Sequence, residues 1–516
     1  MREYSTQIKA SFLNGLQRDS DNPRNSPFLA QCKYMKPTER GLRPPTRVVS
    51  PFDPEDPPVG SWPFPQIIRG KQITLVAYAT AIEWVTEEAP YWTRAAITTY
   101  DAYDEASTKA ITTGGTWQFI DFFNTWYLLN GICIVSQTNE KGMFGLTDKV
   151  LVNDTIVVSA GCDFRGRAIF GGFDTGIDWD TVWNHYGTLP VTMDESMELG
   201  ASFVLWTTPG GGDLPGLFDK LKAPYGVFTE DETAGLSDSL FADMWRRNEI
   251  GFMPMPWQGT IMHLKPLGNT VVAYGGQGMA ILPSLSGDLP GFGMEQINKL
   301  GISSRGAVGG DDNHHLVVAS DGALYMVGGE AKISRLGYRD IFSPMIGQEI
   351  MVVHNPQLDE FFISGSDEAD EPLAFILTKS GLGEAPQQVT SAYYATGDFL
   401  DDTTGEDTEV IIVSDDLDFN IRDIKMLTTI EIGTETAYDM HIAVDWRMKK
   451  SDAYTRSSWK KVNNEGFARA QVSGVEFRVC LKIANYTGTE IDYVTAKWQL
   501  TGKRTVRGLR AEAPNT

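Results

Sequence analysis

The chain has 516 residues and a formal net charge of −23, from 44 basic and 67 acidic residues. Its composition, 42% hydrophobic and 22% charged, is that of an ordinary globular protein, and its length predicts two or three domains with ample burial. The acidic balance excludes a global positive field for binding nucleic acid, although it leaves a local basic patch open.

The chain carries no sequence signal for a membrane or for disulfides. The opening residues are polar and lack the apolar segment of a signal peptide, and the longest apolar run, residues 75–85, is too short to span a bilayer. We expect no membrane anchor. None of the cysteines has metal-ligand spacing, so we expect free, buried thiols that fold in a reducing compartment. The four are Cys32, Cys133, Cys162 and Cys480.

Residues 1–66 are rich in proline, which prevents helix and blocks pairing in the centre of a sheet. An ordered segment without a core of its own usually lies on another surface, from the same chain or a neighbour. Its apolar side chains argue against disorder. We therefore predict an extended N-terminal arm that packs on a neighbouring subunit, with these interface anchors: Phe12, Leu16, Phe28 and Tyr34.

Residues 67–385 contain paired apolar runs separated by turns. Hairpins that recur in this way, each unable to bury its own face, predict a β-propeller-like domain. We group the runs at 150–152, 155–158 and 168–170 as one repeat unit. The other runs cover residues 72–78, 81–85, 117–122, 126–131, 203–206, 261–264, 271–274, 279–282, 314–327, 358–364 and 373–377.

Two local features of this region predict particular structures. Asp321-Gly322, between apolar runs, predicts a type I′ hairpin turn with positive φ at both central positions. Residues 237–250 predict a helical insertion, because Leu240, Phe241 and Met244 fall on one helical face.

From residue 386 to residue 516 the strand pattern resumes after an acidic, turn-rich linker near residues 398–409. In residues 477–483 apolar residues alternate with Arg478, Cys480 and Lys482, as in an antiparallel strand with one exposed face. We predict a β-sandwich-like C-terminal domain, with strands lying beside the propeller as the alternative.

Catalytic motifs are nearly absent from the sequence, and we predict no catalytic, cofactor-binding or metal-ligating residues. His314-His315 follows Asp311-Asp312-Asn313 and resembles a metal cluster. Adjacent strand residues face opposite sides of a sheet, however, so the two histidines cannot easily share a metal. We interpret this segment as a turn that leads into a strand.

Glycine-rich and acidic segments suggest other sites. The run 210–213, Gly-Gly-Gly-Asp, could form a nest for an anion, but no helix follows it and we interpret it as a turn. The acid pairs near Asp367 and Asp370, and at Asp401-Asp402, could serve a glycosidase or bind calcium, and solvated loops are the alternative.

Basic and aromatic residues alternate between residues 446 and 461. This pattern could grip a nucleic acid, contact an acidic neighbouring subunit, or form a solvated strand face. We take the following residues as interface candidates: Trp446, Lys449, Lys450, Trp459 and Lys460.

Taken together, several segments resemble the β-propeller tail nozzle or hub proteins of tailed bacteriophages, particularly those with short tails. Residues 262–269, 301–304 and 320–325 form the most similar stretch. Other similar segments are 12–19 with 41–44, 116–119 with 126–131, 166–172, and 466–479.

This resemblance implies a non-enzymatic virion protein that works without a cofactor. Such a subunit forms a ring, expected to be hexameric, around the DNA exit channel and anchors other tail, adaptor or fibre proteins. Genomic DNA would pass through without sequence-specific binding, and the protein would assemble in the host cytoplasm and reside in the virion tail. The alternative is a carbohydrate-binding or glycan-active β-propeller. The acid pairs and the exposed aromatic residues favour this alternative.

Overall fold

The computed structural model divides the chain into two compact units. The smaller comprises residues 1–47, 374–387 and 399–516, and the larger comprises residues 48–373 and 388–398. The structure describes residues 3–8, 14–16, 19, 28–45, 59–68, 71–88, 91–101, 106–112, 116–122, 125–138, 149–153, 157–173, 201–207, 251–285, 291–329, 332–386, 388–389, 409–435, 439–484 and 490–502. Among these residues strands predominate, and the helices are short: α4 (Arg339–Phe342) and the 3-10 turn η4 (Ser343–Met345).

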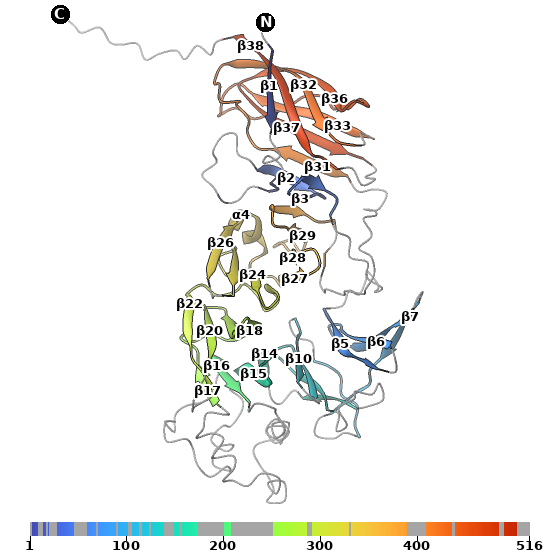
Figure 1. Cartoon of the computed structure of the whole chain (residues 1–516), viewed down its shortest axis with the longest axis vertical. Helices are drawn as coiled ribbons and strands as arrows, with labels where there is room; N and C mark the ends of the chain where they lie inside the picture. The colour runs from blue at the N-terminus through green and yellow to red at the C-terminus, as the bar shows by residue number, and fades with distance from the viewer. Residues whose placement is uncertain are drawn as a thin grey trace, which may run out of the picture. The chain divides into compact units, whose positions relative to one another are not determined.

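The larger unit is a series of small sheets built from strands that follow one another along the chain (Figure 1). The first contains β5 (Gly60–Ile68), β6 (Lys71–Ala77), β7 (Ile82–Glu88) and β8 (Tyr91–Ala96). The second contains β10 (Gln118–Phe122), β11 (Thr125–Leu129), β12 (Ile134–Thr138), β13 (Val150–Asn153) and, parallel to β13, β9 (Thr99–Asp101).

Three further sheets and then a hairpin follow in the same manner. The third has β14 (Val158–Phe164), β15 (Arg167–Phe173), β16 (Phe203–Trp206) and β17 (Gly251–Pro254). The fourth has β18 (Ile261–Leu267), β19 (Thr270–Gly275), β20 (Gly278–Leu285), β21 (Gly291–Phe292) and β22 (Glu295–Asn298). The fifth has β23 (Val308–Gly310), β24 (His314–Val318), β25 (Leu324–Gly328) and β26 (Ile333–Gly337), and β27 (Met351–Asn355) then pairs with β28 (Glu360–Ser366).

Successive sheets of the larger unit pack face to face. One buried cluster joins the first two sheets through side chains such as Leu75, Trp84 and Trp126, and another joins the third and fourth through Trp206 and Leu264. The leading strands β10, β14 and β18 also contact one another. Consecutive antiparallel sheets stacked in this way form a propeller-like unit, so the predicted all-β fold is confirmed.

The predicted grouping of the third repeat is wrong. Strand β13 pairs with β12 of the preceding sheet, whereas β14 begins a new sheet with β15. The runs are similarly apolar before and after the boundary between β13 and β14, so composition does not mark where one sheet ends and the next begins. Sheet membership therefore depends on tertiary pairing that local sequence does not encode.

The predicted type I′ turn is also wrong. Val318 pairs with Leu324, which leaves a five-residue connection, and the amide of Gly322 donates to the carbonyl of Ala319 at 2.9 Å. Gly322 has φ +81°, but Asp321 is not among the residues with positive φ. The Asp321 carboxylate instead accepts from the amide of Ala323 at 3.1 Å, which stabilises a longer turn.

The smaller unit is sandwich-like, as predicted. One sheet has the order β1 (Glu3–Ile8), β38 (Tyr493–Gly502), β32 (Ile424–Gly433) and β36 (Phe467–Gly474). The other contains β29 (Pro372–Leu377), β30 (Leu382–Glu384), β2 (Leu29–Lys33), β31 (Val410–Ser414), β37 (Glu476–Ile483), β33 (Met440–Arg447), β34 (Thr455–Arg456) and β35 (Lys460–Lys461).

An aromatic stack joins these two sheets. The ring of Phe419 stacks on Trp498 of β38 at 5.5 Å and lies 6.0 Å from Phe477 of β37. All three side chains are buried. The core of the smaller unit therefore lies between its sheets, as the alternating strand pattern predicts.

The N-terminal segment is not a separate arm in its described parts. Strand β1 pairs along its whole length with β38, and β2 lies between β30 and β31. The short hairpin of β3 (Lys36–Thr38) and β4 (Gly41–Arg43) is bonded to the same unit, because Leu42 and Ile491 exchange both backbone hydrogen bonds. The segment pairs with the sandwich because its own length provides no core.

Two of the prolines in strands lie at edges, where the missing N–H of proline is tolerated. Pro37 lies in the two-stranded β3–β4 sheet, and Pro63 lies in the edge strand β5, whose register shifts after it. Because β5 belongs to the larger unit, the structural boundary after residue 47 precedes the predicted boundary at residue 66. The predicted boundary at 385 likewise falls inside residues 374–387, which the smaller unit includes.

All four cysteines are free and buried, as predicted. In the described part of the chain no helix has the length and apolarity needed to cross a membrane. The predicted helix at residues 237–250 and the segment 210–213 lie outside the described residues.

Candidate functional site

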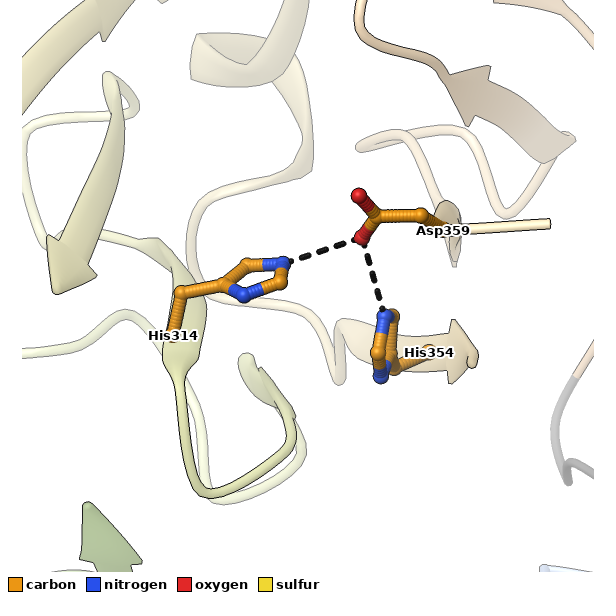
Figure 2. Close-up of side chains that lie close together, drawn as sticks. All are labelled: His314, His354 and Asp359. Carbon is orange, nitrogen blue, oxygen red and sulfur yellow. Dashed lines mark hydrogen bonds and ion pairs between the residues drawn. The ribbon is translucent and has the colours of Figure 1, made fainter. Parts of the chain in front are cut away.

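Two histidines and one aspartate of the larger unit converge on a single point. Figure 2 shows the rings of His314 and His354 directed at one carboxylate oxygen of Asp359. The Oδ1 atom of Asp359 lies 3.1 Å from Nε2 of His314 and 3.5 Å from Nε2 of His354. One ligand atom from each of the three residues lies within 4.8 Å of the others.

His314 is held in place by the turn that precedes it. It is the first residue of β24, and its amide and that of Asn313 donate to Oδ1 of Asp311 at 3.1 and 2.9 Å. The same carboxylate lies 3.5 Å from Nδ1 of His314. Burial would raise the pKa of Asp311, but these hydrogen bonds and the nearby His314 ring outweigh it and lower the pKa.

Asp359 ends the turn between β27 and β28. The side chain of Asn355 stabilises this turn by accepting from the amides of Gln357 and Leu358 at 3.0 and 3.4 Å. Asp359 itself has φ +53°, a left-handed conformation that aspartate adopts more readily than most residues. The turn thereby brings the carboxylate back beside His354, which lies five residues earlier on β27.

His354 is the most enclosed of the three side chains. It is 6% exposed, against 25% for His314 and 33% for Asp359. The ring of Phe361 stacks on His354 at 4.5 Å and meets the edge of His314 at 5.6 Å. Burial lowers the pKa of His354, although Asp359 opposes the shift, so this ring is neutral at neutral pH.

His315 points away from this group, as the strand alternation predicts. Its Nδ1 accepts from the Tyr274 hydroxyl at 2.7 Å, and its Nε2 lies 2.8 Å from the carbonyl of Pro266. The side chain is fully buried. His314 and His315 therefore do not share a site, and the predicted turn leading into a strand is confirmed.

Sequence reasoning missed His354 and Asp359. It considered His314 only with its neighbours in sequence, whereas the other two side chains come from a hairpin about forty residues later. A His-x4-Asp spacing around a tight turn is the one local signal that could have identified them. Their proximity to His314 depends on contacts between β23, β24 and β27.

The basic residues of the C-terminal stretch form ion pairs within their own sheet. Asp416 binds two arginines at 2.7 Å, Arg447 through Nη2 and Arg478 through Nε, and Arg447 also donates to Glu476 at 2.7 Å. Both guanidinium carbons lie 4.3 Å from the centre of the Tyr454 ring. These arginines are already compensated by carboxylates, which leaves them poorly available to phosphate.

A second ion pair extends this network. Arg456 makes two parallel bonds to Asp445, at 2.7 and 2.8 Å, and its guanidinium lies 5.7 Å from the Trp459 ring. Trp459 packs against a small cluster that includes Cys480. Trp459 is half-buried at this position.

The interface candidates between residues 446 and 461 do not form one patch. Trp446 pairs with Phe477 and so lies on the sheet face opposite Arg478 and the Trp459 cluster. Lys449 and Lys450 are exposed in the turn after β33, and Lys460 is exposed on β35. These three lysines retain the accessibility that an interface requires.

The N-terminal interface candidates also separate. Leu16 is only 4% exposed and its amide donates to Leu382 at 2.7 Å, so this side chain is committed to the chain's own core and cannot anchor a partner. Phe28 and Tyr34 are half-buried, and Lys33 lies 4.8 Å from the Tyr34 ring centre. Phe12 lies outside the described residues.

The acid pair near Asp367 stabilises a turn. Oδ1 of Asp367 accepts from the amides of Ala369 and Glu371 at 2.8 and 3.0 Å, and Asp370 is exposed. This arrangement favours the solvated-loop interpretation of these acids over a glycosidase pair. Asp401 and Asp402 lie outside the described residues.

Comparison with known proteins shows only distant structural likeness. No protein-family model and no curated protein matches the chain. Its structure is similar to BamB from Moraxella catarrhalis, with 9% identity, a TM-score of 0.31 and coverage of 80% of this chain and 95% of that one. An exo-beta-1,3-galactanase from Phanerochaete chrysosporium has 9% identity, a TM-score of 0.27 and coverage of 77% and 98%.

PorZ, a surface component of the type-IX secretion system of Porphyromonas gingivalis, has 11% identity and a TM-score of 0.31. The alignment covers 79% of this chain, and the chain spans only 46% of the PorZ structure. These likenesses are too distant to bear on the function of the chain.

Proposed function

We propose that the protein is a non-enzymatic structural subunit of a bacteriophage tail, working as a nozzle, hub or adaptor in a ring around the DNA exit. The proposal rests first on the sequence resemblance to tail nozzle and hub proteins. One structural observation supports it: in the described residues, networks of buried polar side chains link strands of the chain to one another. Asp416 with its two arginines and Gln118 with its partners are examples.

Gln118 illustrates how polar groups serve the scaffold. Its side-chain amide on β10 donates to the carbonyl of Met262 on β18 at 2.7 Å, and its carbonyl accepts from Gly161 on β14 at 3.1 Å. One buried side chain thus ties three consecutive sheets together. Cross-links of this kind suit a subunit that must keep its shape under load.

In this proposal the subunits form a closed ring, expected to contain six copies, that anchors neighbouring tail proteins. The net charge of −23 suits a channel through which DNA passes without tight binding, because an acidic wall provides few phosphate contacts. The exposed lysines of the smaller unit, Lys449, Lys450 and Lys460, would then contact acidic neighbours.

Native mass measurement of the full-length protein tests the proposal, together with binding assays on a glycan array and on duplex DNA. We expect a discrete oligomer, no glycan binding, and little DNA binding at moderate salt. A strict monomer that binds glycans would overturn the proposal in favour of a carbohydrate-binding propeller. Tight DNA binding with a steep salt dependence, lost on neutralising these lysines, would contradict the low-friction channel.

A further inference from the structure

We infer that His314, His354 and Asp359 bind a divalent transition-metal ion, of the zinc class, between two neighbouring sheets of the larger unit. Two imidazole nitrogens and one carboxylate oxygen are a ligand set that suits zinc, cobalt, nickel or copper rather than calcium or magnesium. The three residues come from β24, from β27 and from the turn that precedes β28. A metal there would join the fifth sheet to the β27–β28 hairpin.

The spacing of the ligand atoms fits such an ion. Bonds of about 2.0–2.1 Å in a tetrahedral site place the donor atoms roughly 3.3 Å apart. The two nitrogens lie 3.1 and 3.5 Å from the same oxygen of Asp359, on either side of that value. The remaining nitrogen–nitrogen separation is within 4.8 Å, so a modest closure of the rings completes the site.

The surroundings of the ligands also match those of metal sites. A metal-bound histidine usually has its other ring nitrogen beside a carboxylate or carbonyl, which fixes its orientation. Asp311 lies 3.5 Å from Nδ1 of His314, and two backbone amides hold that carboxylate in place. Phe361 stacks on His354 and limits its rotation.

The backbone conformation of Asp359 indicates that its side chain has a role, such as binding a ligand. Its left-handed conformation is one that glycine would adopt at lower cost, yet the position carries a carboxylate directed at two imidazoles. His314 and Asp359 are each about a quarter to a third exposed, so an ion and a water molecule as fourth ligand can reach the site.

Titration of the full-length protein, free of any polyhistidine tag and treated with a chelator, tests the inference. Zinc added in a calorimeter should bind with one ion per chain, and cobalt should give the visible absorption of a nitrogen- and oxygen-ligated site. Zinc should also raise the melting temperature, because an ion that binds only the folded state stabilises it. Absence of saturable binding by either metal would overturn the inference.

Variants assign the binding to these residues. His314→Ala and His354→Ala should abolish it, Asp359→Asn should weaken it severely, and Asp311→Asn should weaken it by about tenfold through the orientation of His314. His441→Ala is the matched control, because its ring lies in the smaller unit, where Nδ1 is 3.2 Å from the carbonyl of Asp439. It should bind zinc as the unaltered protein does.

A hydrogen-bonded His–Asp–His group without metal is the competing outcome. It predicts that zinc changes neither the melting temperature nor the heat of mixing, while Asp359→Asn still lowers the melting temperature. Metal binding that survives unchanged in a folded His314→Ala variant would place the ion elsewhere and would refute the site. Circular dichroism spectra of each variant establish that it is folded.

Discussion

Asp416 is the residue on which the polar packing of the smaller unit depends. Its side chain is 8% exposed and compensates two arginine charges that are themselves partly buried. Burial alone would raise its pKa, but the nearby Tyr454 hydroxyl, the hydrogen bond from Arg478 and the charges of both arginines lower it. The carboxylate is therefore ionised at neutral pH, and its loss would leave charged partners without compensation.

We predict that Asp416→Asn lowers the free energy of unfolding by about 3 kcal/mol, because one partner of a buried ion pair is removed. Asp439→Asn is the matched control: it breaks an exposed pair with Lys461 at 3.1 Å and should cost less than about 1 kcal/mol. Urea denaturation of both variants measures the difference. Equal stability of the two would show that the network contributes nothing beyond a surface pair.

His263 provides a pH-dependent prediction. Burial and then the charge of Lys265 lower its pKa to about 3, and its Nδ1–H donates to the carbonyl of Arg305 at 3.2 Å. An unfolded chain would protonate this ring near pH 6.5, so the unfolded state binds the extra proton between about pH 6.5 and 3. Stability should therefore fall as the pH drops through this window, by up to about 1.4 kcal/mol per pH unit.

His263→Asn separates this effect from the titration of the carboxylates. Asparagine keeps an N–H donor near the position of Nδ1 but does not titrate. The unfolding free energy of the variant should therefore depend less steeply on pH between pH 6.5 and 4, by the equivalent of about one bound proton. Urea midpoints at several pH values measure both slopes. Parallel curves for the two proteins would contradict the assignment of a buried, neutral His263.

Some residue roles were accessible from the sequence and others were not. The buried state of the cysteines and the alternation in β37 follow from composition and period. Asp416 is separated by 31 and 62 residues from its arginine partners, and His314 by 45 residues from Asp359. No local pattern encodes such pairs, because they form only when particular strands meet.

At the scale of strands and sheets, we predict that substituting Gln118 weakens the packing of three consecutive sheets. Replacing it with methionine keeps the volume but removes the donor to Met262 and the acceptor for Gly161. Each buried polar group left without a partner costs about 1–3 kcal/mol, so Gln118→Met should lower the unfolding free energy by about 3 kcal/mol. Gln118→Glu keeps only the acceptor and should also destabilise. A methionine variant that melts like the unaltered protein would refute the tie between the sheets.

The N-terminal strands give a second prediction at this scale. Deleting residues 1–45 removes β2 from between β30 and β31, and with it Leu29, Cys32 and Met35, which are fully buried. We expect the smaller unit to lose its cooperative melting transition and to become sensitive to protease. Survival of a protease-resistant smaller unit would contradict this expectation and would instead favour the predicted arm that packs on a neighbouring subunit.

The existence of the strands was predictable, because it follows from the period of the apolar residues and from the turn residues. The predicted runs 261–264 and 477–483, for example, lie within β18 and β37. Strand partnership was not, as β13 and β2 show. Both pair according to which unsatisfied edge is nearest in the fold rather than in the sequence.

At the scale of the whole molecule, the chain forms two β units, and segments from both ends of the chain build the smaller one. The sequence indicated an all-β chain with a change near residue 385, but it could not indicate that residues 1–47 join the C-terminal strands. In the proposed ring, the exposed lysines of one subunit would contact acidic residues of its neighbours.

Electron microscopy of the purified full-length protein, with rotational symmetry determined from end-on views, tests the proposed function most directly. The proposal predicts a closed ring, expected to be sixfold, with an open central channel. Particles that remain single subunits with no rotational symmetry at any protein concentration would contradict it.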